Sequence, residues 1–317
     1  MNIEGKINKI EPLLEALNQR LKTCDICPRN CYTDRLAGQK GYCGGGKDMA
    51  LFTAFLHCGE EPAISGENGS GTVFFSGCNL KCIYCQNYEF SQIKKGKLTT
   101  IDKLTDIMLG LEKDGAHNIN LVTPTHFLPQ ILKSLYLALK RGLKIPIVYN
   151  TSGYEKKEVI SQLEGVVDIY LTDLRYLNSE LAKKYSNAED YPMVATESIK
   201  EMYRQYPQAI WDEDILKQGT IVRHLVLPGY LSESKKVLNW IKDNTPKVLP
   251  SVMFQYQPYF KANTYPEINR PINKNEYKEI KQFVEELGLE GGWIQEFGPQ
   301  SDLAGVHFKA DQKDSFI

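Results

Sequence analysis

Three cysteines form the part of this sequence with the most specific chemistry. Cys78, Cys82 and Cys85 are spaced Cys-x3-Cys-x2-Cys, directly after a short apolar run. Cysteine thiolates hold iron–sulfur clusters, and a cubane 4Fe-4S cluster usually takes four of them. Three thiolates leave one iron open to an outside ligand, so the spacing predicts a cluster that takes part in chemistry. A zinc knuckle or three buried free thiols is the alternative, because short cysteine spacings also suit zinc and free cysteine is often buried.

A second cysteine group lies nearer the N-terminus, in a glycine-rich segment that can form little core. Its members are Cys24, Cys27, Cys31 and Cys43. Four cysteines so close together predict a segment folded around metal, either tetrahedral zinc or an auxiliary 4Fe-4S cluster. Unmetallated core thiols are the alternative. The eighth cysteine, Cys58, is expected only to pack.

Composition and charge exclude several classes of protein. The chain has 317 residues, enough for one large or two smaller α/β domains, and 38 basic residues nearly balance 39 acidic ones. No net field therefore draws it to nucleic acid or to an anionic membrane. It has no apolar run of about 18 residues and no apolar signal peptide. We therefore expect a cytoplasmic protein, whose eight cysteines favour metal over disulfides in a reducing compartment.

The elements that must position these cysteines follow an alternating pattern. From Thr72 onward, strand-like runs alternate with helical periodicity, which predicts βαβ units and a parallel sheet. The expected strands are 72–76, 118–123, 145–150, 167–173, 221–227 and 252–257. An amphipathic helix is expected over residues 4–21, and Asn273 with Glu276 predicts a capping box for a late helix.

Polar side chains follow the ends of these predicted strands, where parallel barrels carry their reacting groups. Asp173 is placed to meet a cation, a hydroxyl or a substrate, and Arg175 can grip a carboxylate with two donors, unless the two only form an ion pair at the rim. Because alternate side chains of a strand face opposite ways, Arg223 and His224 cannot both face the interior. We expect His224 to do so.

Several motifs together resemble the radical S-adenosylmethionine (SAM) superfamily, and within it the uncharacterised group named for pyruvate formate-lyase activating enzymes. The motifs are His57-x-Gly-Glu-Glu-Pro62, Gly71-Thr-Val-Phe-Phe-Ser-Gly-Cys78, Val122-Thr-Pro-Thr-His126, Val148-Tyr-Asn-Thr-Ser-Gly153 and Arg223-His-Leu-Val-Leu-Pro-Gly229. The resemblance implies an α/β fold: a partial (βα)6 barrel over 67–260, with an N-terminal Cys-rich metal-binding extension over 1–66. Residues 261–317 are expected to supply a helix and a tail that close the barrel.

The resemblance also implies cofactors and site residues. SAM would chelate the open iron of the cluster at Cys78, Cys82 and Cys85, and an electron from the cluster would cleave it to a 5′-deoxyadenosyl radical. A low-potential donor such as flavodoxin or ferredoxin would supply that electron. The residues expected to bind SAM are Tyr84, Thr123, Asn150, Ser152 and His224, and those expected to act on the substrate are His126, Asp173 and Arg175.

Three functions are compatible with the sequence. The first is an activase-like enzyme that abstracts hydrogen from a protein or peptide, and the second is a radical enzyme that acts on a small metabolite. The third is a non-catalytic zinc or iron–sulfur protein that binds a partner or transfers electrons. Cleavage of SAM would separate the third from the other two.

Overall fold

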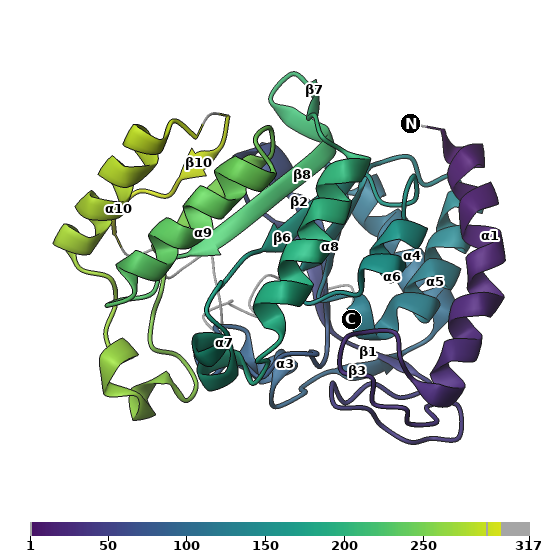
Figure 1. Cartoon of the computed structure of the whole chain (residues 1–317). Coiled ribbons are helices and arrows are strands. Elements are labelled where there is room, and N and C mark those ends of the chain that lie inside the picture. Colours follow the sequence, from purple (N-terminus) through teal and green to yellow (C-terminus); the bar gives the residue numbers. More distant parts are fainter. Residues whose placement is uncertain (1, 290, 299–317) are drawn as a thin grey trace.

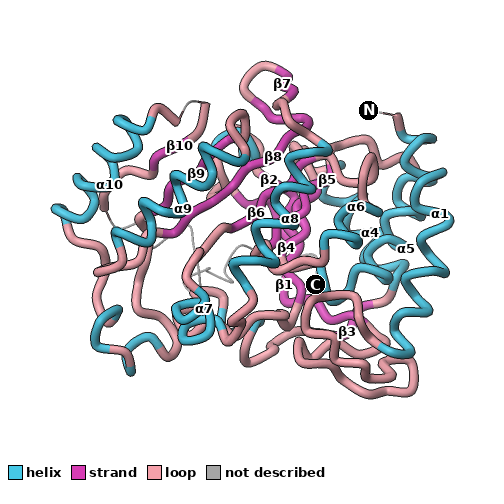
Figure 2. The backbone as a smooth tube through the Cα atoms, in the orientation of Figure 1, coloured by secondary structure: helices cyan, strands magenta, loops and turns pink. Residues whose placement is uncertain are grey.

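The computed structural model describes residues 2–289 and 291–298, and one twisted sheet runs through the middle of that part of the chain (Figure 1). The strand order along the sheet is β10-β9-β8-β6-β5-β4-β2-β1-β3, and β7 pairs with β8 outside this path. Helices flank the strands along the sheet (Figure 2). The predicted α/β class is confirmed.

The six predicted strands are present and pair in parallel as an open barrel. They are β2 (Ser70–Phe75), β4 (Ile119–Val122), β5 (Ile147–Thr151), β6 (Ile169–Asp173), β8 (Ile215–Leu225) and β9 (Leu249–Met253). β10 (Trp293–Ile294) extends the sheet in parallel beside β9. β9 ends four residues before the expected end at 257, so the residues after Met253 form a loop rather than a strand.

An antiparallel edge, which we did not predict, precedes the first parallel strand. β1 (Met49–His57) pairs with β2 on one side and with β3 (Lys97–Thr99) on the other. β7 (Ile210–Asp212) forms a second antiparallel pair, with the start of β8. The sheet therefore crosses the position at residue 66 where we expected one domain to end, while the division itself stays a prediction.

The longer helices bury one apolar face each against this sheet or against a neighbouring helix. They are α1 (Ile3–Gln19), α4 (Ile101–Lys113), α5 (Leu128–Lys140), α6 (Lys157–Gln162), α7 (Ser179–Ser186), α8 (Tyr191–Gln205), α9 (Leu231–Asn244) and α10 (Lys274–Leu287). The predicted capping box of α10 is confirmed. None of the helices in the described part of the chain has the length and apolar character that crossing a membrane requires.

Two short helices belong to the loops at opposite ends of β2. α3 (Tyr88–Ser91) follows the Cys78–Cys85 loop, and α2 (Pro62–Ser65) follows β1. Ala63 and Ile64 of α2 pack against apolar residues that face the inside of the barrel from four strands: Val148, Ile169, Leu171, Ile221 and Leu249. α2 therefore closes the barrel interior at the amino ends of the parallel strands.

Candidate functional site

A cavity of about 440 Å³ occupies the interior of the barrel. Its walls come from both ends of the parallel strands: the loops that follow β2, β4, β5 and β6 at one end, and residues 57–62 at the other. We call the carboxyl ends of the strands the mouth and the segment of residues 58–65 the floor. The floor lies at the opposite end because β1 runs antiparallel to β2, pairing His57 with Ser70 at the start of that strand.

The cysteine loop begins at the mouth directly after β2. Cys78, Cys82 and Cys85 all line the cavity. The loop starts at Gly77, whose φ is +96° and where a Cβ atom would lie only 2.5 Å from the carbonyl oxygen of Cys43. Only glycine fits such a position, so the sequence Gly-Cys allows the N-terminal cysteine segment to pack tightly against this loop.

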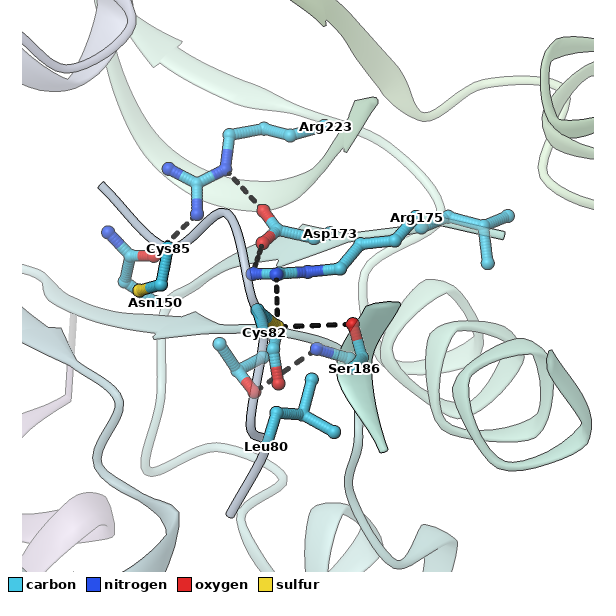
Figure 3. A network of polar contacts seen from close by, with 12 residues as sticks. Leu80, Cys82, Cys85, Asn150, Asp173, Arg175, Ser186 and Arg223 are labelled. Atoms are coloured by element: carbon cyan, nitrogen blue, oxygen red, sulfur yellow. Dashed lines mark hydrogen bonds and ion pairs between the residues drawn. The ribbon is translucent and has the colours of Figure 1, made fainter. Parts of the chain in front are cut away.

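The three thiols lie near hydrogen-bond donors and in a buried environment that suits thiolates bound to a metal centre. Arg175 Nη1 donates a hydrogen bond to Cys82 Sγ at 2.9 Å, and the Ser186 hydroxyl lies 3.1 Å from the same sulfur (Figure 3). Burial raises the pKa of Cys78 to about 12 and that of Cys85 to about 11. Without metal, the Cys78 and Cys85 thiols are therefore protonated at neutral pH, and a bound metal would displace their protons by stabilising the thiolates.

The spacing of the donors bears on the kind of metal. Within residues 2–289 and 291–298, no three Cys, His, Asp or Glu side chains converge on a point that could hold a single metal ion. A cubane cluster takes its thiolates on separate irons and so needs them further apart than the ligands of one zinc ion. In the described part of the chain the three thiols are thus not gathered on one ion, and a cluster at this site stays a prediction.

A charged network joins the mouth to the interior. Asp173 accepts from Arg175 Nη2 and from Arg223 Nε, both at 2.8 Å, and Arg223 Nη2 donates to Asn150 Oδ1 at 2.7 Å (Figure 3). Burial alone would raise the pKa of Asp173, but the two guanidinium groups hold it below its usual value. Asp173 is therefore an anion, and the ion pair with Arg175 that we considered does form, on the wall of the cavity.

Most of the residues predicted at strand ends meet around this cavity. The wall contains Tyr84, Thr123, Asn150, Ser152, Asp173 and Arg175 as well as the three cysteines. Tyr84 is buried, and its hydroxyl contacts that of Tyr176. Thr123 has a φ of +54°, an uncommon conformation for a β-branched residue. The structure thus brings these six side chains within one site, while their roles stay predictions.

His126 lies beside the site and does not line the cavity. Its Nε2 atom is 2.8 Å from the carbonyl oxygen of Ser76, and its ring packs on Phe127. Burial lowers its pKa to about 3, so the ring is neutral. In this position it connects the loop after β4 to the start of the cysteine loop. A role in catalysis stays a prediction that this geometry does not favour.

Our expectation for Arg223 and His224 is reversed in the structure. Arg223 lines the cavity, whereas His224 points to the outer side of β8, with Nδ1 2.8 Å from Leu174 O and Nε2 2.9 Å from Ser234 Oγ. Burial lowers the pKa of His224 to about 4. The physical reason is that the interior holds carboxylates that balance a guanidinium, while the outer side offers a carbonyl and a hydroxyl that suit a neutral imidazole.

Sequence reasoning included Glu60 and Glu61 in a motif but assigned them no role, and the structure shows that they form the polar part of the floor. Asn120 Nδ2 donates to Glu60 Oε1 at 3.0 Å, and Arg223 Nη1 lies 3.5 Å from Glu60 Oε2. Both residues line the cavity. The signal in the sequence was an acidic pair followed by proline between two apolar runs, because charged residues there must lie at a boundary between core and space.

The N-terminal cysteines gather apart from the cavity. Cys24, Cys27 and Cys43 are buried and Cys31 is partly so. The backbone N–H groups of Tyr42 and Gly45 point at the sulfurs of Cys31 and Cys43, at 3.2 and 3.3 Å. Donors of this kind stabilise thiolates, but these cysteines, too, are not gathered on a single ion in the described part of the chain. A metal here, whether zinc or a cluster, therefore stays a prediction.

Comparison with known proteins gives matches over most of the chain. The family model of the radical SAM superfamily matches residues 72–241. The uncharacterized protein MJ0674 of Methanocaldococcus jannaschii is 32% identical over 294 residues, which are 90% of this chain and 81% of that protein. The uncharacterized protein MJ0808 of the same organism is 22% identical over 80% of this chain and 75% of its own length.

Two crystal structures superpose on part of this chain with limited similarity. SuiB of Streptococcus suis superposes with a TM-score of 0.49 and 12% identity over 72% of this chain, and this chain spans about half of SuiB, 48%. Methylornithine synthase, PylB, has a TM-score of 0.47 and 13% identity over 75% of this chain and 74% of its own. The matched model covers more than half of the sequence, including the cysteine loop and the parallel strands from β2 to β8, and the chain belongs to the radical SAM superfamily.

Proposed function

We propose that Cys78, Cys82 and Cys85 bind a 4Fe-4S cluster with which this chain cleaves SAM reductively, in order to abstract hydrogen from a substrate. When bound, the cluster and SAM together supply a 5′-deoxyadenosyl radical. The observation that carries the proposal is that the three thiols surround one end of a cavity, with the Arg175 guanidinium 2.9 Å from the Cys82 sulfur.

The residues of the mouth have roles that follow from their charges. Arg175 stabilises the thiolate of Cys82, and Asp173 holds that guanidinium in place through a second hydrogen bond. Ser152 and Thr123 offer hydroxyl groups to the ribose or carboxylate of SAM from the wall of the cavity, and the buried Tyr84 shapes the same wall. These residues bind and orient the cofactor, and they exclude water from it.

The substrate is either a protein or peptide, as the activase-like resemblance implies, or a small metabolite. An open barrel can admit a peptide loop at its mouth. The closed floor and the buried charges on the cavity wall favour a ligand that places a small polar group deep inside. A single side chain of a peptide and a free metabolite both meet that condition, so we keep the two candidates.

The decisive experiment is reductive cleavage of SAM by anaerobically reconstituted protein. With dithionite, the wild type is expected to form 5′-deoxyadenosine, and Cys82→Ala is expected to form none and to lose the iron bound at the mouth. Cys58→Ala is the matched control, because Cys58 is exposed, belongs to neither cysteine group and borders the cavity only at the floor, away from the three thiols. An unchanged product yield in Cys82→Ala, or no product from the iron-loaded wild type, contradicts the proposal and supports a non-catalytic role.

We further propose that the N-terminal cysteines hold a second metal centre. The test is metal and sulfide analysis of the wild type and of a Cys24→Ala, Cys27→Ala double variant. About four irons with one zinc, the zinc being lost in the variant, identifies a closed structural site. About eight irons, falling to four, identifies an auxiliary cluster. Unchanged metal content in the double variant contradicts a metal site there.

A further inference from the structure

The floor of the cavity presents carboxyl groups to a space that is otherwise closed by apolar side chains. Ala63 and Ile64 of α2 fill the barrel beneath it, and Glu60 and Glu61 come just before them in the chain, separated from Ala63 by Pro62. No sequence rule for parallel barrels requires charge at this end, since the reacting groups of such barrels lie at the mouth. The acidic pair at the floor therefore needs a separate explanation.

The charges around the floor do not balance within the protein. Three carboxyl groups, those of Glu60, Glu61 and Asp173, share the Arg223 guanidinium, while Arg175 faces the Cys82 sulfur as well as Asp173. Asp173 takes two hydrogen bonds at 2.8 Å, but Arg223 lies 3.5 Å from Glu60. Burial raises the pKa of both glutamates above the usual value even though Arg223 opposes this.

Glu61 has an oxygen without a partner. The residue is only 8% exposed, and its Oε2 atom makes no hydrogen bond within the described part of the chain. It lines the cavity beside Ser251, whose hydroxyl stabilises the carboxylate. A buried acceptor left unpaired is costly, and a buried carboxylate needs a counter-charge. Both needs are met by one group that carries positive charge and donates hydrogen bonds.

We propose that the floor is the substrate subsite and that it binds a protonated primary amine, which Glu61 and Glu60 hold from below while the rest of the ligand extends toward the cysteine loop. This inference rests on the proposed function, because the floor is a substrate subsite only if the radical chemistry takes place at the mouth, with the ligand between the two. The amine can belong to a free alkylamine metabolite or to a lysine side chain of a peptide.

The test measures binding to reconstituted protein by anaerobic calorimetry. The first probes are n-pentylamine and its neutral analogue 1-pentanol, and a capped Ala-Lys-Ala peptide with its norleucine analogue distinguishes a peptide from a metabolite. A hydrogen bond to a charged group predicts that the wild type binds the amine about tenfold more tightly than the alcohol. Glu61→Gln is expected to remove this difference, and Glu67→Gln, which changes an exposed glutamate outside the cavity, to keep it.

The outcomes separate this inference from the proposed function. Alcohol binding that is equal in wild type and Glu61→Gln shows that the variant has kept its cavity, so loss of the amine preference alone supports the subsite. An amine preference that survives in Glu61→Gln, or none in the wild type, overturns it. SAM cleavage is measured on the same samples: cleavage without amine binding overturns only this inference, and amine binding without cleavage overturns only the proposed function.

Discussion

The mouth and the floor of the barrel acquire their chemistry in different ways. The mouth is built by loops that each follow a parallel strand, so side chains from distant parts of the chain, such as Cys82, Asn150 and Asp173, meet there. The floor is built by one short segment that precedes the first parallel strand. At the mouth, thiols and guanidinium groups are paired, whereas at the floor carboxyl groups exceed their cations. The two ends are thus suited to different partners, a metal cofactor and a cationic ligand.

Arg223 connects the two ends, and its removal is expected to have the largest effect on stability. Arg223→Ala leaves Asp173 and Glu60 buried without their shared cation, which by analogy with broken buried ion pairs lowers the free energy of unfolding by about 3–5 kcal/mol. Urea unfolding of the metal-loaded protein measures it. Arg204→Ala is the control, since Arg204 is half exposed and ion pairs screened by solvent contribute little to stability. Equal losses in both variants would show that the ends are not coupled through Arg223.

Glu155 provides a contrast to the glutamates of the floor. It is a buried carboxyl near the mouth, but its oxygens have hydroxyl partners. It accepts hydrogen bonds from Thr125 and Thr151, and burial raises its pKa from 4.5 to about 7. Between these pH values the unfolded chain loses this proton while the folded protein keeps it. The free energy of unfolding therefore falls as the pH rises through this window, by about 3 kcal/mol.

Glu155→Gln is expected to remove this dependence, because the amide stays neutral throughout. Unfolding by urea at several pH values between 4.5 and 7 checks it. Glu158→Gln, three residues along and exposed, is expected to leave the slope unchanged. A wild-type protein that gains stability with rising pH over the same range would contradict the sign of the shift.

Replacing Arg175 is expected to have the smallest of the three effects, and that effect is confined to the mouth. Arg175→Gln removes a positive charge and a hydrogen bond from the Cys82 sulfur, so we expect the reduction potential of the cluster to fall by roughly 50–100 mV, the equivalent of one charge-assisted hydrogen bond. Potentiometric titration followed by electron paramagnetic resonance measures it. Ser186→Ala is expected to shift the potential less in the same direction. An unchanged potential in Arg175→Gln would mean that the guanidinium does not act on the cluster.

The mouth was largely predictable from sequence and the floor was not. The cysteine spacing, the six parallel strands and the rule that barrel sites lie at strand ends together located Cys82, Asn150 and Asp173. The same rule directs attention away from segments before a strand, so it overlooked Glu60 and Glu61. β1 and β3 were missed because their pairing is antiparallel and depends on neighbours distant in sequence.

The orientation of β8 shows a second limit of sequence reasoning. Alternation correctly predicted that one of Arg223 and His224 faces inward, but the choice depended on what lay across the barrel. Carboxylates from β6 and from the floor, Asp173 and Glu60, decide it in favour of the arginine. Such a choice needs the tertiary arrangement of charges, which periodicity along a single strand does not contain.

The position of the floor before β2 has a consequence for how such an enzyme changes over evolution. Residues 60–85 form one continuous piece of chain that carries both the acidic floor and the cysteine loop, with β2 between them. A genetic exchange that replaced this piece would transfer the proposed substrate subsite and the proposed cluster ligands together. Arg175, which contacts Cys82, and Arg223, which lies beside Glu60, come from later parts of the chain and would not be part of such an exchange.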